Sequence, residues 1–148
     1  MIYTNTKKGF TLAELMAVVA IIAIIAAIGL GSYRKSTDRA IFSDGLAGAH
    51  ALAAAYDEYY YEHGSYPNSM LKIPVGLANQ TGTASSITTR YFVYTWDSTG
   101  KFIKASRLSG DYYLKVYAES AAANNLKSDE CVGVSGTNGA DFCSSMGY

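Results

Sequence analysis

The first residues of the chain have the order expected of a proteolytic processing site: a short polar segment, a glycine and then a long apolar run. The polar segment contains Lys7 and Lys8 and ends at Gly9. In a secretory signal the cleavage site follows the apolar region, which is therefore lost with the signal. Cleavage after Gly9 would instead keep the apolar run in the mature chain and create a new amine on Phe10.

Glu14 is the only charged residue between Gly9 and Arg34. The 19 uncharged residues from Leu15 to Tyr33 are enough to span a bilayer as a helix. A charge within a bilayer costs at least roughly 2.5–3.5 kcal/mol, and such residues usually have a function. Two roles for Glu14 are open: it caps the positive end of the helix dipole at the membrane surface, or its charge has a specific function of its own.

Type IV prepilins have a processing site and first helix that closely resemble the run Lys7-Lys8-Gly9-Phe10-Thr11-Leu12-Ala13-Glu14-Leu15-Met16 of this chain. The resemblance implies that a prepilin peptidase cuts after Gly9 and methylates the amine of Phe10, and that Glu14 serves filament assembly. It also implies a structural subunit, not an enzyme, that machinery in the bacterial inner membrane polymerises into an extracellular helical filament of identical copies. Such filaments serve adhesion, surface motility or uptake, and nothing in these residues chooses among those outcomes.

This resemblance divides the chain into three parts. Residues 1–9 are the cleaved leader, 10–33 the transmembrane and filament-core helix, and 34–148 a globular domain on the periplasmic or extracellular side. The positive-inside rule does not decide the orientation, because the basic residues of the leader are balanced by Arg34 and Lys35 beyond the apolar run. The orientation therefore depends on the cysteines.

Cys131 and Cys143 lie 12 positions apart in a tail rich in glycine and serine. A disulfide between them would persist only in an oxidising compartment, which places the C-terminal domain outside the cytoplasm. Two free cysteines in a cytosolic domain are the alternative. The pair also matches the C-terminal disulfide-bounded region of many type IV pilins in relative position, so the resemblance implies a disulfide here.

The helix is expected to continue beyond the membrane segment. Apolar residues repeat there at alternating steps of four and three, which marks one helical face: Phe42, Leu46, Ala49, Ala53, Tyr56 and Tyr60. The sequence predicts that this helix ends near His63, because Gly64 favours a C-cap and Pro67 terminates helices. Small residues over 45–55 indicate close packing against a sheet or a neighbouring helix.

An α+β fold is expected, with the long helix packed on an antiparallel sheet of three to four strands, as in type IV pilins. Residues 67–89 have no sustained period and predict a long loop, used for display or subunit contact or simply covering an end of the sheet. The runs 90–96, 102–108 and 112–119 predict strands separated by turns. In the third run, Leu114, Val116 and Ala118 form the apolar face that should cover the helix.

Enzymatic, cofactor and metal chemistry have little support in the sequence. Both histidines, His50 and His63, fall on the expected helix, and Gly-x-Ser-x-Gly, His-Glu-x-x-His and phosphate-loop motifs do not occur. No cofactor and no metal site are therefore expected. Four residues of the tail carry oxygen ligands of the kind calcium binds, without EF-hand spacing, and a solvated polar loop is the preferred interpretation: Asp129, Glu130, Asn138 and Asp141. Asn79 begins a weak glycosylation acceptor pattern.

Two other functions fit parts of the sequence. Major pseudopilins, which form a short periplasmic piston for type II secretion, resemble the chain through the Gly-x-Tyr-Pro junction at 64–67 but usually lack the C-terminal disulfide. A minor pilin that binds DNA during uptake would use a basic patch on adjacent strands: Lys101, Lys104, Arg107 and Lys115. A chain with 12 basic and 12 acidic residues lacks the charge of a duplex binder. Nucleic acid is not expected as a partner of a major pilin.

Overall fold

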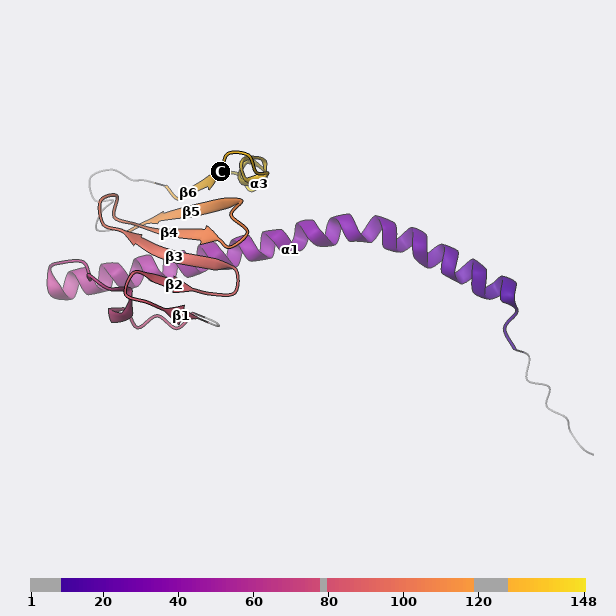
Figure 1. Ribbon diagram of the computed structural model, residues 1–148, viewed down its shortest axis with the longest axis horizontal. Helices are drawn as coiled ribbons and strands as arrows, with labels where there is room; N and C mark the ends of the chain where they lie inside the picture. The colour runs from indigo at the N-terminus through magenta and orange to yellow at the C-terminus, as the bar shows by residue number, and fades with distance from the viewer. Residues whose placement is uncertain (1–8, 78–79, 119–127) are drawn as a thin grey trace, which may run out of the picture. The chain divides into compact units, whose positions relative to one another are not determined.

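The computed structural model describes residues 9–77, 80–118 and 128–148 (Figure 1). The chain divides into two compact units, Met1–Asp38 and Arg39–Tyr148. One helix, α1 (Leu12–His63), begins in the first unit and ends in the second. The prediction of a helix that continues to His63 is therefore confirmed.

α1 ends because Gly64 leaves the helical conformation. Its φ of 70° lies in the left-handed region, which glycine enters without steric cost. The Gly64 N–H still donates to the Tyr60 carbonyl at 2.8 Å, so the last turn is closed before the chain turns away. The glycine at this position sets the length of α1.

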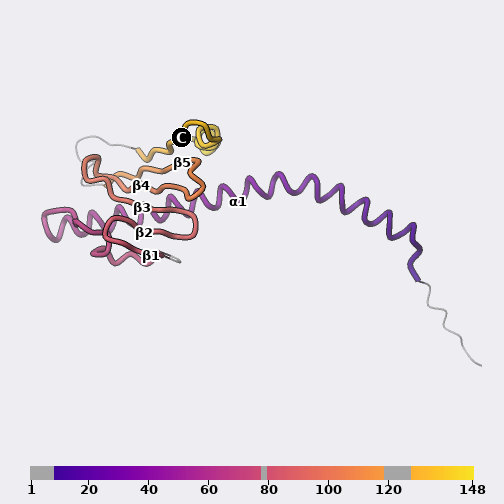
Figure 2. The backbone as a smooth tube through the Cα atoms, viewed as in Figure 1, coloured from indigo at the N-terminus to yellow at the C-terminus, as the bar shows by residue number. Residues whose placement is uncertain are grey.

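The second unit contains an antiparallel sheet whose strands neighbour one another in chain order (Figure 2). Among the described residues the strands are β1 (Thr81–Gly82), β2 (Ser86–Thr88), β3 (Phe92–Asp97), β4 (Phe102–Arg107), β5 (Tyr112–Tyr117) and β6 (Glu130–Gly133). A short 3-10 helix, η1 (Met70–Lys72), precedes the sheet, and α3 (Gly139–Ser145) follows it. Each strand pairs with the next, as a meander requires.

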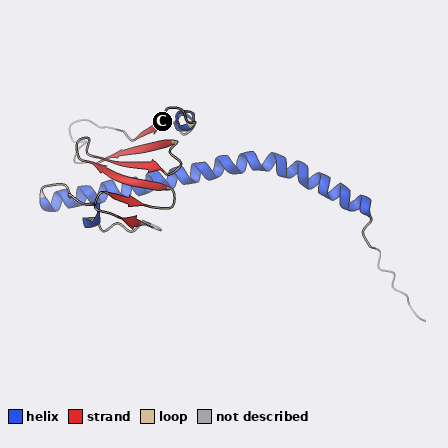
Figure 3. Cartoon of the chain, viewed as in Figure 1, coloured by secondary structure: helices blue, strands red, loops and turns tan. Residues whose placement is uncertain are grey.

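The part of α1 that belongs to the second unit lies across one face of the sheet (Figure 3). The predicted helical face is confirmed, since Phe42, Ala49 and Tyr56 are buried in the core that the helix shares with the sheet. From the sheet, Leu114 and Val116 of β5 are each 1% exposed, as their alternation predicts. Burial of this shared apolar surface holds the second unit together.

Two glycines of α1 allow the helix to approach the sheet closely. A methyl group at Gly45 would fall within the ring of Phe92, and one at Gly48 would meet the phenol of Tyr94. The Tyr94 hydroxyl in turn donates to the Gly45 carbonyl at 3.5 Å. The small-residue stretch therefore packs against the sheet, which is one of the two partners that the sequence allowed.

The sheet is wider than the three to four strands expected, because residues 67–89 are not only a loop. They contain η1, β1 and β2, and a tight turn in which Thr83 N–H donates to the Ser86 carbonyl at 2.7 Å. β2 has only three residues, so the alternation of Ser86, Ile87 and Thr88 is too short to mark a strand in the sequence. The backbone of β2 is held by pairing with β3, with Ile87 opposite Tyr94, and this tertiary pairing decides its structure.

The C-terminal segment is attached to the sheet by both hydrogen bonds and a disulfide. β6 pairs with β5, and Cys131 of β6 is bonded to Cys143 of α3 with the two Cα atoms 5.6 Å apart. The expected disulfide-bounded C-terminal region is thus confirmed. Gly133 also lets β6 pass directly against the backbone of Ala140, where a larger residue would collide.

Candidate assembly site at the start of the first helix

The beginning of α1 presents an apolar surface with no cover from the described chain. Every residue from Gly9 to Thr37 is exposed, including the branched side chains that would ordinarily form a core. By length and composition α1 is suited to cross a membrane, and no part of its most apolar stretch is buried. An exposed apolar surface of this extent requires lipid or other protein as its surroundings.

Gly9 and Phe10 lie just before this helix, outside regular secondary structure. Phe10 is 87% exposed. The Gly9–Phe10 peptide bond is therefore on an accessible part of the chain outside regular secondary structure, directly ahead of the residues that begin α1. The structure places the sequence-predicted processing residues and Glu14 within one short segment.

Glu14 and Thr11 are joined by three hydrogen bonds at the start of α1. The Thr11 N–H and hydroxyl each donate to Glu14 Oε2 at 2.8 Å, and the Glu14 N–H donates to Thr11 Oγ1 at 3.3 Å. This reciprocal arrangement is a capping box, which satisfies N–H groups that have no partner inside the helix. No role for Thr11 was predicted from the sequence. The Thr-x-x-Glu spacing of Thr11 and Glu14 is a sequence signal for a capping box and could have predicted it.

The capping box uses only one oxygen of the Glu14 carboxylate. Among the described residues, no donor bonds to Oε1. The carboxylate is therefore held by its own helix through Oε2, and a carboxylate oxygen such as Oε1 can accept further hydrogen bonds. The capping role and a role in pairing with another subunit are compatible in this geometry.

The four basic residues of the predicted patch do not form one free surface. Lys104 and Lys115 face each other on neighbouring strands, whereas Arg107 pairs with Phe92, one of the buried residues. Lys115 Nζ donates to Glu130 Oε2 at 2.8 Å, and this hydrogen bond raises the pKa of Lys115. Carboxylates thus neutralise part of the charge that a DNA-binding surface would need.

Two of the four residues considered for calcium, Asp129 and Glu130, have other partners in the second unit. Asp129 lies 2.9 Å from the His50 imidazole, and Glu130 accepts from Lys115 and from the Tyr117 hydroxyl. Asn138 precedes α3 and Asp141 is exposed within it. The described residues contain no group of three or more potential metal-binding side chains. Asn79, the possible glycosylation acceptor, lies outside the described residues.

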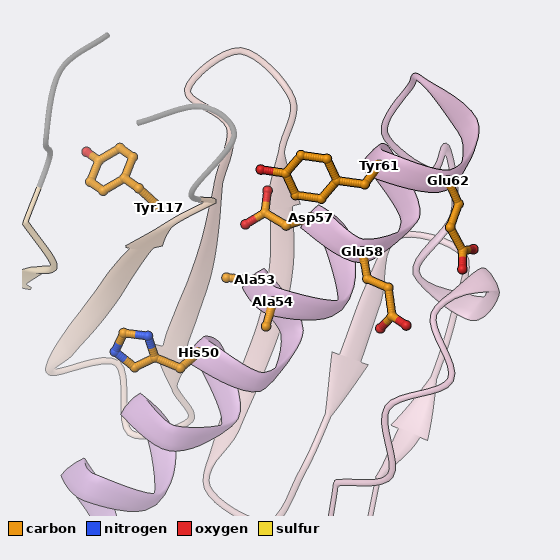
Figure 4. Close-up of a pocket in the computed structure, with 8 residues that line it drawn as sticks. All are labelled: His50, Ala53, Ala54, Asp57, Glu58, Tyr61, Glu62 and Tyr117. Carbon is orange, nitrogen blue, oxygen red and sulfur yellow. The ribbon is translucent and has the colours of Figure 1, made fainter. Parts of the chain in front are cut away.

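Two pockets of the second unit are open grooves beside α1. One is lined by His50, Asp57, Tyr61 and Tyr117 together with small and acidic residues of the helix (Figure 4). In this view His50, Asp57 and Tyr61 point to one side of α1, while Glu58 and Glu62 point to the other side. Carboxylates therefore lie on both sides of α1, Asp57 on one and Glu58 and Glu62 on the other.

Comparison with known proteins identifies the same N-terminal segment. Residues 4–30 match the family described as the prokaryotic N-terminal methylation motif. A fimbrial protein of Neisseria meningitidis serogroup A is 32% identical over 121 residues, which are 82% of this chain and 61% of that protein. A type IV major pilin protein, PilE1, of Neisseria gonorrhoeae is 31% identical over 121 residues, 82% of this chain and 64% of that protein.

The chain thus spans between 61% and 64% of the length of these relatives. The fimbrial protein EcpC of Eikenella corrodens is 44% identical over 63 residues, 43% of this chain. The similarity to the Neisseria proteins reaches over four fifths of the chain, and so extends beyond the methylation-motif segment into the sheet unit. Since the long apolar helix, the antiparallel sheet and the C-terminal disulfide are also present, the chain belongs to the type IV pilin family.

Proposed function

We propose that this chain is a structural subunit without catalytic activity that polymerises through its N-terminal helix into a type IV pilus. The names of its relatives, fimbrial protein and type IV major pilin, support this proposal. The observation that carries it is the apolar part of α1, which is exposed throughout and holds one carboxylate near its start. A polymer of parallel helices would bury this surface and pair this charge.

Processing precedes assembly in this proposal. A prepilin peptidase removes the leader 1–9 by cutting after Gly9, and the new amine on Phe10 is methylated. The exposed Gly9–Phe10 bond lies outside regular secondary structure, which suits a protease because the peptide bond is accessible. The processed subunit rests in the bacterial inner membrane until the assembly machinery adds it to an extracellular filament.

Glu14 supplies the charge that selects the register of each new subunit. The amine of Phe10 and the Glu14 side chain lie about one turn apart, so each is better served by a neighbour displaced along the filament. Thr11 donates to Glu14 Oε2 in the capping box. Glu14 Oε1 then accepts a hydrogen bond from the Phe10 amine of the incoming subunit. Desolvation offsets much of the pairing energy in low dielectric, so the main effect is specificity of docking.

The test is the substitution Glu14→Gln in the full chain. The glutamine side chain keeps an amide oxygen for the Thr11 bonds but has no charge, so this substitution separates pairing from capping. Filament yield should fall by at least about tenfold, because an unpaired amine buried in the assembly costs several kcal/mol. Filaments are counted by electron microscopy and the subunit in them is identified by mass spectrometry.

Intact mass and N-terminal sequencing provide the control. The Glu14→Gln chain should still begin at methylated Phe10, because cleavage does not need the carboxylate. Filaments of normal yield from a correctly processed Glu14→Gln chain would exclude the pairing role. A start at Met1 in wild-type filaments would exclude the processing step.

A further inference from the structure

An open apolar groove runs along the side of α1 to which Glu58 and Glu62 point. Its walls are alanines of α1, Ala51, Ala54 and Ala55, and the segment Ile73–Val75. Glu58 and Glu62 line the C-terminal end of the same groove, and Figure 4 shows both carboxylates on this side of the helix. The groove is therefore apolar at one end and carries two carboxylates at the other, where Lys72 and His63 also line it and His63 Nδ1 lies 3.9 Å from Glu62 Oε2.

The exposed residues of α1 beside this groove follow one helical face. They are Ala47, Ala51, Ala54, Glu58 and Glu62, with successive steps of four, three, four and four. All five are exposed. Residues at these steps lie in one line along a helix. We call this line the acceptor face.

An earlier stretch of α1 has the same steps and complementary chemistry. Its exposed residues are Ile24, Ile28, Gly31, Lys35 and Arg39. We call this line the donor face. Each donor residue precedes its acceptor counterpart by 23 positions, so isoleucines correspond to alanines, glycine to alanine, and two cations to two carboxylates.

We propose that the groove of one subunit binds the donor face of a second copy of this chain, with the two helices parallel and offset by 23 residues. This inference rests on the proposed function. Copies that repeat one head-to-tail contact form an open helical filament with a single polarity, so neighbouring helices run in the same direction. Parallel helices bring the apolar ends of the two faces together and the charged ends together.

The charges select this offset over its neighbours. At an offset of 23, Lys35 meets Glu58 and Arg39 meets Glu62. A shift of one turn in either direction leaves a single cation–carboxylate pair. With the shorter offset, Lys35 also lies against Ala54 with no carboxylate opposite. Unpaired charges at an interface disfavour the wrong arrangement more than pairing favours the right one.

The apolar half of the contact is shaped for close approach. Alanines and Gly31 allow two helix backbones to come near each other, as small residues do where helices cross. Ile28 is 75% exposed, so its side chain is available to fill the groove opposite Ala51. A contact of this kind covers part of the apolar surface of α1 that the described chain leaves open.

Cysteine cross-linking in assembled filaments measures the offset directly. The full chain with Ile28→Cys and Ala51→Cys should give a ladder of disulfide-linked multimers on a non-reducing gel after mild oxidation. The matched control, Ile28→Cys with Ala47→Cys, lies one turn out of register and should give no ladder, and neither should the single variants. A ladder from the control pair, or none from the 28/51 pair in intact filaments, overturns the inference.

Charge exchange provides a second measurement that does not depend on added cysteines. Lys35→Glu and Glu58→Lys should each lower filament yield about tenfold, and the double variant should restore most of it, because close interfacial charge pairs couple by more than about 1 kcal/mol. Arg34→Glu changes the net charge equally but lies off the donor face, so it should have less effect. Two single losses without rescue in the double variant contradict the contact.

These results are separable from the proposed function. Wild-type filaments that form normally, with no 28/51 ladder and no rescue, refute this contact and leave the pilus function intact. If the wild-type protein forms no filaments in its own cells, the proposed function fails and this contact fails with it.

Discussion

Gly45 of α1 lies directly beneath the ring of Phe92 of β3, with the ring in the space that a Cβ would occupy. Phe92 is completely buried and also contacts the ring of Tyr112. The ring therefore has little freedom to move aside. The separation between helix and sheet is set at this point by the absence of a side chain.

Gly45→Ala should destabilise the second unit by about 1–3 kcal/mol, because the added methyl forces a well-packed ring from its position. Alanine is the better helix former, so propensity alone predicts the opposite sign. Denaturant unfolding of the purified chain measures the change. Gly76→Ala is the matched control, since Gly76 is exposed and nothing lies within 4 Å of its added methyl. If both variants unfold at the same denaturant concentration, the close approach does not limit stability.

Replacing Cys131 and Cys143 together by serine should lower the unfolding free energy by about 2–5 kcal/mol. The disulfide joins β6 to α3 and restricts the unfolded chain, and Cys143 is also buried at 4% exposure. Thermal denaturation with and without a reductant checks this. The reductant should lower the midpoint of the wild type and leave the serine variant unchanged. Two free thiols per chain in the native secreted protein would contradict the pairing.

Stability should fall at strongly alkaline pH through Tyr94. Burial, reinforced by the carboxylate of Asp44, raises the pKa of Tyr94 to about 12 from its ordinary value of 10.0. Between these two pH values the folded state keeps the Tyr94 proton that the unfolded state loses. The contribution of Tyr94 to the unfolding free energy is therefore complete below pH 10.0 and disappears as the pH rises to about 12. The loss corresponds to roughly 2–3 kcal/mol over that interval.

The Tyr94→Phe variant isolates this effect from the other tyrosines. It loses the weak bond from the hydroxyl to the Gly45 carbonyl, which lowers stability at every pH. Its unfolding free energy should decline less between about pH 10 and pH 12 than that of the wild type. Equal slopes for the two proteins over this interval would show that Tyr94 does not titrate differently in the folded state.

Assembled filaments should bind duplex DNA weakly at physiological salt. Strong binding requires several lysines or arginines on phosphates, and affinity then falls steeply as salt rises. Lys115 is bonded to Glu130, and Arg107 lies 3.9 Å from Asp111. Glu130→Gln releases Lys115 and should increase DNA retention at low salt, as a filament pull-down can measure. Tight, salt-sensitive binding by the wild type would instead support the minor-pilin alternative.

The sequence by itself determined the long helix, its end at Gly64 and the segment that holds Gly9, Phe10 and Glu14. These features are local: an uncharged run of bilayer length, a glycine at a helix end and a contiguous motif each act through residues close in sequence. The strands β3 to β5 were also predictable, because their apolar residues alternate along the chain.

Only the tertiary structure decided β1, β2 and β6, because these strands are short and their backbones are held by pairing with neighbouring strands. The tertiary structure also decided the surroundings of the basic residues. Arg107 lies opposite the buried Phe92 of β3, whereas Lys115 forms an ion pair with Glu130. The basic patch that the sequence suggested is therefore divided. Pairing register and the choice of charge partners depend on residues far apart in the chain. Their energies exist only once the backbone has brought those residues together.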